Sequence, residues 1–273
     1  MRPTRLLLTP TIMPLDKDTI AANFSAAAND YDQYAVMQQQ AARLLVGRLT
    51  GLRPQLVGGP ILEVGCGTGA VSQELVALFP ERRLTLVDFA AGMVDHNRQA
   101  LAPLLAPGHQ VDWQVRDAET IDLRSHYALI ISCLTIQWFQ DLAASLSRLT
   151  AALRPGGLLL CSYLGDGSFP EWRQACHALG LPCTMNPMPD SRAVLELVRP
   201  LGHEVSAWDE RIVVPYPTIQ AFFRALKKTG TNTRTAEAGL SRSQMARLLS
   251  CWPGQSAGPL TITYQINTLL VRA

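Results

Sequence analysis

The sequence predicts an α/β fold built on a doubly wound, mostly parallel sheet of seven strands. Two observations support this prediction: strand-like and helix-like segments alternate from Pro60 onward, and the strand-like segments are almost continuously apolar. Continuous apolar runs are typical of parallel strands, which are buried between two helical layers. The 273 residues are predicted to form a single domain, because no internal repeat and no long linker divides them.

The N-terminal region contains helix signals only. Residues 1–17 resemble a flexible leader, and Asp18 or Thr19 can cap the helix that follows. A longer helix is predicted over 36–49, where apolar residues recur at helical spacing. We expect residues 18–50 to form a helical cover.

Residues 60–165 carry the alternating pattern and form the predicted core of the domain. The predicted strands are 61–64, 83–88, 111–115, 127–133 and 158–163, and the predicted helices are 70–79, 90–101 and 141–153. A turn at 154–157, with the sequence Arg-Pro-Gly-Gly, is expected before the fifth strand.

The alternation stops after Ser168, so residues 166–259 are predicted to be an inserted substrate and lid region. Its predicted elements are helices at 170–179, 190–198, 217–228 and 241–250 and a strand at 204–214. A last strand, 260–271, has alternating apolar residues and should pair antiparallel at the end of the sheet.

Composition excludes several classes of function. The net charge is only +2 and no Lys/Arg block occurs, which gives no basis for nucleic acid binding. The six cysteines are scattered without a C-x-x-C pair, so neither a zinc site nor a disulfide framework is indicated. The early apolar run is broken by Thr9 and Pro10, and no segment approaches the roughly 20 apolar residues that a membrane span needs. We expect a soluble, cytoplasmic protein without a membrane partner, and a monomer.

Three alternating glycines follow the first predicted strand. Gly65, Gly67 and Gly69 allow a sharp turn and the close approach of a ligand to the backbone. The helix behind them offers unpaired N–H groups and partial positive charge to an anion. With Ala70 as the third small residue, the spacing also fits a dinucleotide site, and a simple glycine turn is the structural alternative.

Glu63 favours a ligand other than a dinucleotide. It lies two residues before the first glycine, where its carboxylate can face a cation at the carboxyl end of the strand. Gly69 also makes the loop tighter than the dinucleotide form. An amino acid that carries a nucleoside would place its ammonium group near Glu63 and its carboxylate near the helix. We therefore predict that S-adenosylmethionine binds at this loop, which includes Cys66.

The second predicted strand ends in Asp88, 21 residues after Gly67. A carboxylate at this position can accept hydrogen bonds from both ribose hydroxyls, although it could also cap the next helix. Phe89 and Met93 could pack on the adenine face.

The third predicted strand ends in an acidic segment. The Asp117 side chain or the Ala118 N–H could bind the adenine edge, with Glu119 beside them. An ordinary acidic loop is the alternative interpretation.

Residues after the fourth predicted strand would lie near the methionine end of the cofactor. Ser132 and Leu134 are the expected contacts. Gln137 and Trp138 are more often packing residues beneath a cofactor than substrate contacts, and they are the weaker candidates.

A polar and aromatic cluster lies between the two N-terminal helices. Tyr31, Tyr34 and Gln38 could cover a site, but the pattern alone favours an ordinary helix surface. None of the five histidines falls at a predicted strand end beside Ser or Cys, and no cluster suggests a metal. Methyl transfer from a sulfonium needs neither, because the acceptor has only to be aligned and stripped of water. A carboxylate acceptor would also need no general base, since it is ionised near neutral pH.

Several segments resemble known families. The segment 61–69, Asp88, Asp117 and the turn at 154–157 resemble the class I S-adenosylmethionine-dependent methyltransferases, which have a Rossmann-like fold. More specific segments are similar to the malonyl-acyl-carrier-protein O-methyltransferases of biotin synthesis. These segments are 21–38, 132–142, 226–232, 241–244, 252–253 and 260–264.

The resemblance implies an activity. Such an enzyme would methyl-esterify the free carboxylate of malonyl-acyl carrier protein, or of malonyl-CoA, and release S-adenosyl-L-homocysteine. The ester could then be elongated toward pimeloyl, the biotin precursor. Tyr31 would line the reaction centre and orient the carboxylate.

A cation should hold the acceptor or the acidic face of its carrier. The candidates are Arg224, Lys227, Lys228, Arg234 and Arg242. For any one of them, an ordinary solvated helix charge is the alternative interpretation. Other hypotheses are a class I methyltransferase with another small-molecule or carboxylate acceptor, a non-enzymatic cofactor-binding protein, and an NAD-dependent oxidoreductase.

Overall fold

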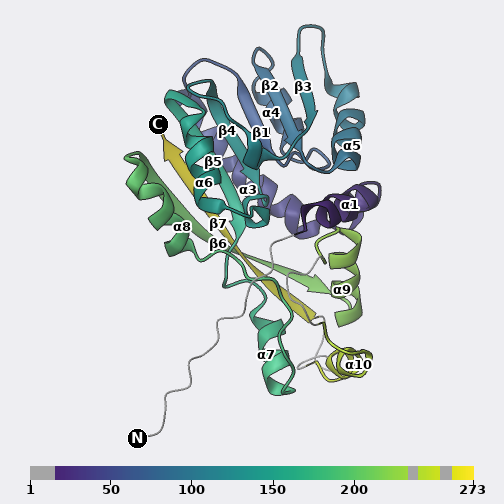
Figure 1. Cartoon of the computed structure of the whole chain (residues 1–273). Coiled ribbons are helices and arrows are strands. Elements are labelled where there is room, and N and C mark those ends of the chain that lie inside the picture. Colours follow the sequence, from purple (N-terminus) through teal and green to yellow (C-terminus); the bar gives the residue numbers. More distant parts are fainter. Residues whose placement is uncertain (1–15, 233–238, 253–259) are drawn as a thin grey trace, which may run out of the picture.

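The computed structural model describes residues 16–232, 239–252 and 260–273, and it confirms the seven-stranded α/β sheet (Figure 1). The strand order is β3-β2-β1-β4-β5-β7-β6. The strands are β1 Ile61–Val64, β2 Arg83–Asp88, β3 Gln110–Val115, β4 Tyr127–Cys133, β5 Leu153–Leu164, β6 Glu204–Tyr216 and β7 Leu260–Arg272.

Strands β1 to β5 are parallel, and their order reverses between β1 and β4. This reversal is where doubly wound sheets bind ligands, outside the carboxyl ends of the strands. Strand β7 pairs antiparallel with β5, as predicted, but it is not at the end of the sheet. The edge is occupied by β6, which pairs with β7 along its whole length.

Helices cover both faces of the sheet because successive residues of each strand point to opposite faces. Ile61 belongs to an apolar cluster with α3, α4 and α5, whereas Leu62 and Val64 belong to a second cluster with α6 and α8. These helices are α3 Val36–Leu52, α4 Ser72–Leu78, α5 Ala91–Leu101, α6 Leu142–Ala151 and α8 Ser191–Val198. Short 3-10 helices occur at Arg53–Gln55, Ala102–Leu104, Ala118–Thr120, Ile136–Trp138 and Arg199–Leu201.

Several predicted boundaries were wrong. The cap of the first helix, α1 (Lys17–Ala27), is Asp16, whose carboxylate accepts the N–H groups of Asp18 and Thr19, so neither of those residues is the cap. Of the predicted leader, 1–15 lie outside the described residues and Lys17 is already helical. The predicted helix at 70–79 begins only at Ser72.

The predicted turn at 154–157 is an irregular part of β5. The register between β4 and β5 shifts between Tyr127 and Leu129, and Gly156 adopts a positive φ of 75°. The Arg-Pro-Gly-Gly segment therefore forms a bulge within a strand rather than a connection before it.

Strands β6 and β7 extend beyond the end of β5 and carry a second group of helices (Figure 1). These are α7 Pro170–Ala178, α9 Ile219–Lys228 and α10 Arg242–Ser250. Phe169, Trp172 and Phe222 pack with Ile262 and Tyr264 of β7 in a separate apolar cluster.

The N-terminal helices lie across the carboxyl ends of the parallel strands (Figure 1). Helix α1 packs on α5, and the short α2 (Tyr31–Tyr34) contacts α9. No helix among the described residues has the length and apolarity required to cross a bilayer.

Candidate cofactor and acceptor site

A cavity of about 1100 Å³ lies at the carboxyl edge of the sheet, where the strand order reverses. The ends of β1, β2 and β4 form one side, and segments from α1, α2, α9 and the 184–190 loop form the others. Twelve of the predicted site residues line it: Tyr31, Gln38, Glu63, Gly65, Cys66, Gly67, Asp88, Phe89, Met93, Leu134, Gln137 and Trp138.

Gly69 and Ser132 were predicted to contact the cofactor, but they do not line the cavity. A Cβ at Gly69 would meet Leu101 and Asn97, so this residue faces the α5 side of the loop. The Ser132 hydroxyl is buried and donates to the Val64 carbonyl at 2.9 Å. Both residues support the loop and the strand ends from behind.

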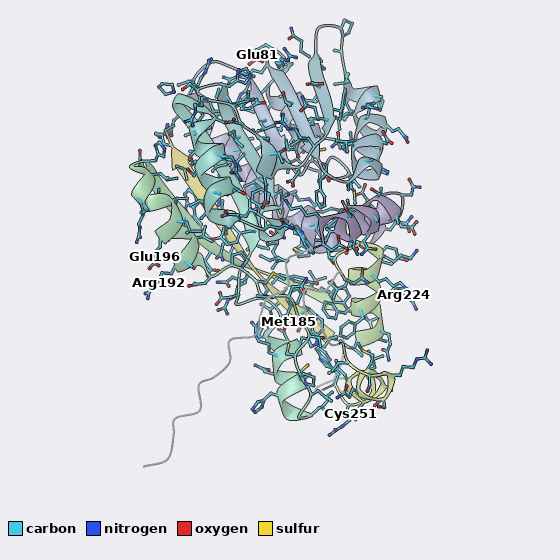
Figure 2. All side chains as sticks on the ribbon, in the orientation of Figure 1. Glu81, Met185, Arg192, Glu196, Arg224 and Cys251 are labelled. Carbon is cyan, nitrogen blue, oxygen red and sulfur yellow. The ribbon has the colours of Figure 1, made fainter. Side chains whose placement is uncertain are left out.

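The basic candidates that the structure describes also do not line the cavity. Arg224 and Lys227 are exposed, and Arg224 lies on the outer side of α9 (Figure 2). Lys228 is paired with Asp30 at 2.6 Å, and Arg242 is exposed on α10. Arg234 lies outside the described residues. Helical spacing places Arg224 and Lys227 on the exposed side of α9, because Phe222, Ala225 and Thr229 occupy its buried side.

The glycine loop has a positive φ at all three of its glycines, Gly65, Gly67 and Gly69, and the first two show how the loop meets the cavity. Gly65 has φ of 72°, and a Cβ there would overlap the Thr135 side chain. Gly67 has φ of 49°, and no atom lies within 4 Å of the position of its missing Cβ. The loop is therefore closed against β4 at Gly65 and lies open to the cavity at Gly67.

Asp88 anchors this loop to the second strand. Its carboxylate accepts hydrogen bonds from the Gly67 N–H at 3.0 Å and the Ala90 N–H at 2.9 Å. Burial raises the pKa of Asp88 to about 6, although these N–H donors oppose the rise. The carboxyl is thus ionised at neutral pH and retains acceptor capacity for ligand hydroxyls.

Glu63 is only 2% exposed, yet it lines the cavity. The Ser72 hydroxyl donates to its carboxylate at 2.6 Å. Burial raises the pKa of Glu63 to about 8, partly opposed by the Ser72 hydrogen bond, and the charge of Asp88 adds to the rise. A buried acid of this kind favours a ligand cation, which restores its ionised form. The open glycine loop and this acid together fit a cofactor that carries an amino-acid ammonium.

The third strand end lies beside the main cavity. Asp117 and Ala118 line a small adjacent cavity of about 20 Å³, which shares Phe89 and Trp138 with the main one. Lys17 of α1 bridges Asp117 at 2.5 Å and Glu119 at 2.8 Å. Glu119 lines neither cavity, although it shares this lysine with Asp117.

Tyr31, Tyr34 and Gln38 all line the cavity, which supports the alternative that they cover a site over that of an ordinary helix surface. Tyr31 packs against Ala28 and Met93. Burial raises its pKa well above the usual range, and the negative charge of Asp88 raises it further. The Tyr31 hydroxyl therefore stays protonated and can act as a hydrogen-bond donor.

The structure adds residues that the sequence did not single out. Phe24 of α1 makes edge-to-face contacts with Trp138 at 5.5 Å and Phe89 at 6.4 Å between ring centroids. Farther from the strand ends, aromatic and methionine side chains from the β6–β7 extension, its helices and the 184–190 loop form an apolar chamber of the same cavity. Its residues are Phe169, Trp172, Met185, Met188, Tyr216, Phe223, Met245 and Tyr264. Aromatic enrichment at 169–172 and 222–223 was the one available signal.

Comparison with known proteins agrees with this geometry. Residues 62–159 match a family model described as a methyltransferase domain. The chain is 32% identical over 252 residues to a malonyl-[acyl-carrier protein] O-methyltransferase of Magnetococcus marinus, covering 90% of this chain and 89% of that protein. It is 36% identical to a bifunctional biotin biosynthesis protein of Bordetella avium, covering 90% of this chain and 50% of that protein.

Among solved structures, the magnesium protoporphyrin IX methyltransferase of Synechocystis PCC 6803 with bound S-adenosylhomocysteine has the same fold. The TM-score is 0.60 at 15% identity, covering 94% of this chain and all of that one. The alignments with the sequence relatives cover both the sheet and the flanking helices of this chain. The chain therefore belongs to the malonyl-[acyl-carrier protein] O-methyltransferase family.

Proposed function

We propose that this protein transfers the methyl group of S-adenosylmethionine to the free carboxylate of malonyl-acyl carrier protein. The product would be the methyl ester that enters elongation toward pimeloyl and biotin. The relatives support this activity across most of the chain. The structural observation that carries it is the chemistry of the cavity lining, which suits an acceptor that is already ionised.

No His, Lys or Arg lines the cavity in the part of the chain that the structure describes. Of the three carboxylates that line it, Glu63 and Asp88 are assigned to the cofactor, and Asp190 accepts the Arg192 N–H as a helix cap. An alcohol or amine acceptor requires a group that takes up its proton, whereas a carboxylate is deprotonated at neutral pH. When bound, the cofactor supplies a methyl group on a cationic sulfur, which a carboxylate oxygen takes while the C–S electron pair stays on sulfur. Both charges disappear in this step, and an apolar, water-poor cavity favours that loss of charge.

The chain's own residues hold the two reactants. Glu63 would bind the cofactor ammonium, and Asp88 would accept the ribose hydroxyls while it fixes the Gly67 N–H. Tyr31 would donate a hydrogen bond to the acceptor carboxylate and align it. Since burial keeps the Tyr31 hydroxyl protonated, this residue positions the acceptor without taking a proton.

The acceptor enters a cavity with space beyond the cofactor site. The apolar chamber around Phe169, Phe223 and Tyr264 would receive the acyl end of the thioester and exclude water from it. A cationic side chain is not needed beside the carboxylate, because the sulfonium provides the opposite charge.

The carrier protein would dock outside the cavity on the surface of α9 and α10. The described segments 217–232 and 239–252 contain five Lys and Arg residues and no Asp or Glu, in a chain whose net charge is only +2. Arg224 and Lys227 are exposed on this surface, and we propose that they meet the acidic face of the carrier.

The test is methyl transfer from labelled S-adenosylmethionine to malonyl-acyl carrier protein. Acetyl-acyl carrier protein is the control, because it has the same carrier and thioester but no free carboxylate. We expect a labelled, base-labile ester with the malonyl form alone. Equal labelling of both forms would place the methyl group on the carrier instead. Cofactor binding without transfer to either form would require another acceptor.

A further inference from the structure

A buried chain of hydrogen bonds reaches Glu63 from behind the cavity. Trp113 Nε1 donates to Asn97 Oδ1 at 2.9 Å, and Asn97 Nδ2 donates to Ser72 Oγ at 2.8 Å. Ser72 Oγ in turn donates to Glu63 Oε2 at 2.6 Å. Asn97 and Ser72 are both fully buried, and neither they nor Trp113 line the cavity.

The direction of this chain is determined by its members. An indole N–H can only donate, so the Asn97 oxygen must face Trp113 and its NH₂ group must face the other way. That NH₂ group also donates to the Cys66 carbonyl at 3.2 Å, an acceptor only. Ser72 accepts from Asn97, which leaves its own proton for Glu63. The three bonds that connect Trp113 to Glu63 therefore all donate toward the carboxylate.

We propose that Trp113, Asn97 and Ser72 are positioning residues for cofactor binding, which aim the Glu63 carboxylate and, through Cys66, the glycine loop at the amino-acid end of S-adenosylmethionine. The proposal rests on the assignment of Glu63 to the cofactor ammonium and is independent of the acceptor. The three residues act through Glu63 and Cys66, which line the cavity.

Because Glu63 is buried, the hydrogen bond from Ser72 affects how easily its carboxyl group ionises. Its pKa is raised to about 8 by burial, so in the free protein the carboxyl is largely protonated at neutral pH, and the Ser72 hydroxyl works against that rise. The other titratable groups that face it are Asp88, with a pKa raised to about 6, and the thiols of Cys66 and Cys133, whose pKa values are raised far enough to remain neutral. Pairing with an ammonium requires loss of the Glu63 proton, so affinity should rise with pH until this group is ionised.

The test measures the calorimetric dissociation constant of S-adenosylhomocysteine from about pH 6 to about pH 9. In Ser72→Ala, the ionised carboxylate loses a charge-assisted hydrogen bond, so we expect about tenfold weaker binding at pH 7 and a difference that shrinks at high pH. Asn97→Asp keeps the acceptor for Trp113, replaces the amide donors and adds a buried carboxyl near Glu63, so it should shift the profile in the same direction and farther than Ser72→Ala. Trp113→Phe should give a smaller loss, about threefold, with the same pH dependence.

Two matched controls separate positioning from packing. Trp208 is also a partly buried tryptophan that packs on the same apolar cluster and has an arginine over its ring, but it makes no bond to this chain. Trp208→Phe should leave the pH profile unchanged. The second control is the ligand 5′-methylthioadenosine, which lacks the ammonium and carboxylate and should bind all the variants alike. Thermal melting of each variant establishes that it is folded.

A loss that is equal at every pH, or equal for both ligands, would show that these residues only stabilise the fold, and would overturn the proposal. The proposal would also be overturned if the dissociation constant of Ser72→Ala had the same pH dependence as that of the native protein. Because no acceptor is present, the outcome is separate from that of the malonyl transfer assay.

Discussion

Asp88 and Glu63 lie near the carboxyl ends of neighbouring strands, yet their surroundings assign them different tasks. Two backbone N–H groups hold the Asp88 carboxylate, whereas the Ser72 hydroxyl and burial set the state of Glu63. Their pKa values are raised to about 6 and about 8, so the folded protein binds more protons than the unfolded chain. Both acids therefore lower the free energy of unfolding as pH rises from about 4 toward 8, and a bound cation would offset this loss.

At the residue scale, Asp88→Ala should weaken S-adenosylhomocysteine binding by about a hundredfold or more. The substitution removes the acceptor proposed for the ribose and also releases the Gly67 and Ala90 N–H groups. Calorimetric titration measures the effect. Affinity within about threefold of the native protein would remove Asp88 from the ribose site.

Tyr31→Phe should lower turnover by about 10- to 100-fold while cofactor affinity is nearly kept, since only the proposed hydrogen bond to the ionised acceptor is lost. Tyr163→Phe is a suitable control, because Tyr163 is a buried tyrosine of β5 that does not line the cavity. Turnover at saturating malonyl-acyl carrier protein is the measurement. An unchanged value for Tyr31→Phe would contradict an aligning role for its hydroxyl.

At the element scale, the cover over the cavity depends on close backbone contacts between helices. Gly92 of α5 donates its N–H to Ser25 Oγ at 3.2 Å, and a Cβ at Gly92 would lie 2.7 Å from the Ser25 carbonyl oxygen. Gly230 after α9 similarly faces the backbone of Asn23 and Phe24. Helix α1 is thus held against α5 on one side and the end of α9 on the other.

Gly92→Ala should lower the free energy of unfolding by about 1–3 kcal/mol, because the new methyl group separates α1 from α5. It should also weaken cofactor binding, since α1 carries Phe24 into the cavity. The matched control is Gly47→Ala in α3, where nothing lies within 4 Å of the added Cβ. Denaturant titration should show that Gly47→Ala stabilises the protein by about 0.5–1 kcal/mol. Equal changes in the free energy of unfolding of Gly92→Ala and Gly47→Ala would contradict a role for the close contact between α1 and α5.

At the scale of the whole molecule, charge is distributed unevenly although its sum is small. The helices α9 and α10 contain Lys and Arg residues but no Asp or Glu. Because the net charge of the whole chain is only +2, the remainder of the chain is net negative. Such asymmetry steers an acidic partner toward one face and makes its association depend on salt.

The double variant Arg224→Glu with Lys227→Glu should raise the KM for malonyl-acyl carrier protein about tenfold and reduce its salt dependence. The affinity for S-adenosylhomocysteine should not change, because neither residue lines the cavity. Arg83→Glu with Arg124→Glu is the charge-matched control, since these exposed residues lie near the amino ends of β2 and β4. Equal effects of the two double variants would exclude α9 as the docking surface.

Much of this architecture was predictable from local patterns. Apolar strands alternating with amphipathic helices specify a parallel sheet, in which Glu63 lies near the end of the first strand and the glycines follow that strand directly. Residues at strand ends share the carboxyl edge of the sheet in any doubly wound fold. The positions of Glu63, Gly65, Gly67 and Asp88 at the cavity therefore follow from their place in the chain.

Only the tertiary structure decided which remote side chains join them. Helical periodicity relates residues within one helix, but it does not say which other element covers the buried face. Packing placed Phe24 and Tyr31 in the cavity, left Arg224 and Lys227 on the surface, and connected Trp113 to Glu63 through Asn97 and Ser72. Each of these outcomes depends on contacts between segments far apart in sequence, which local pattern does not encode.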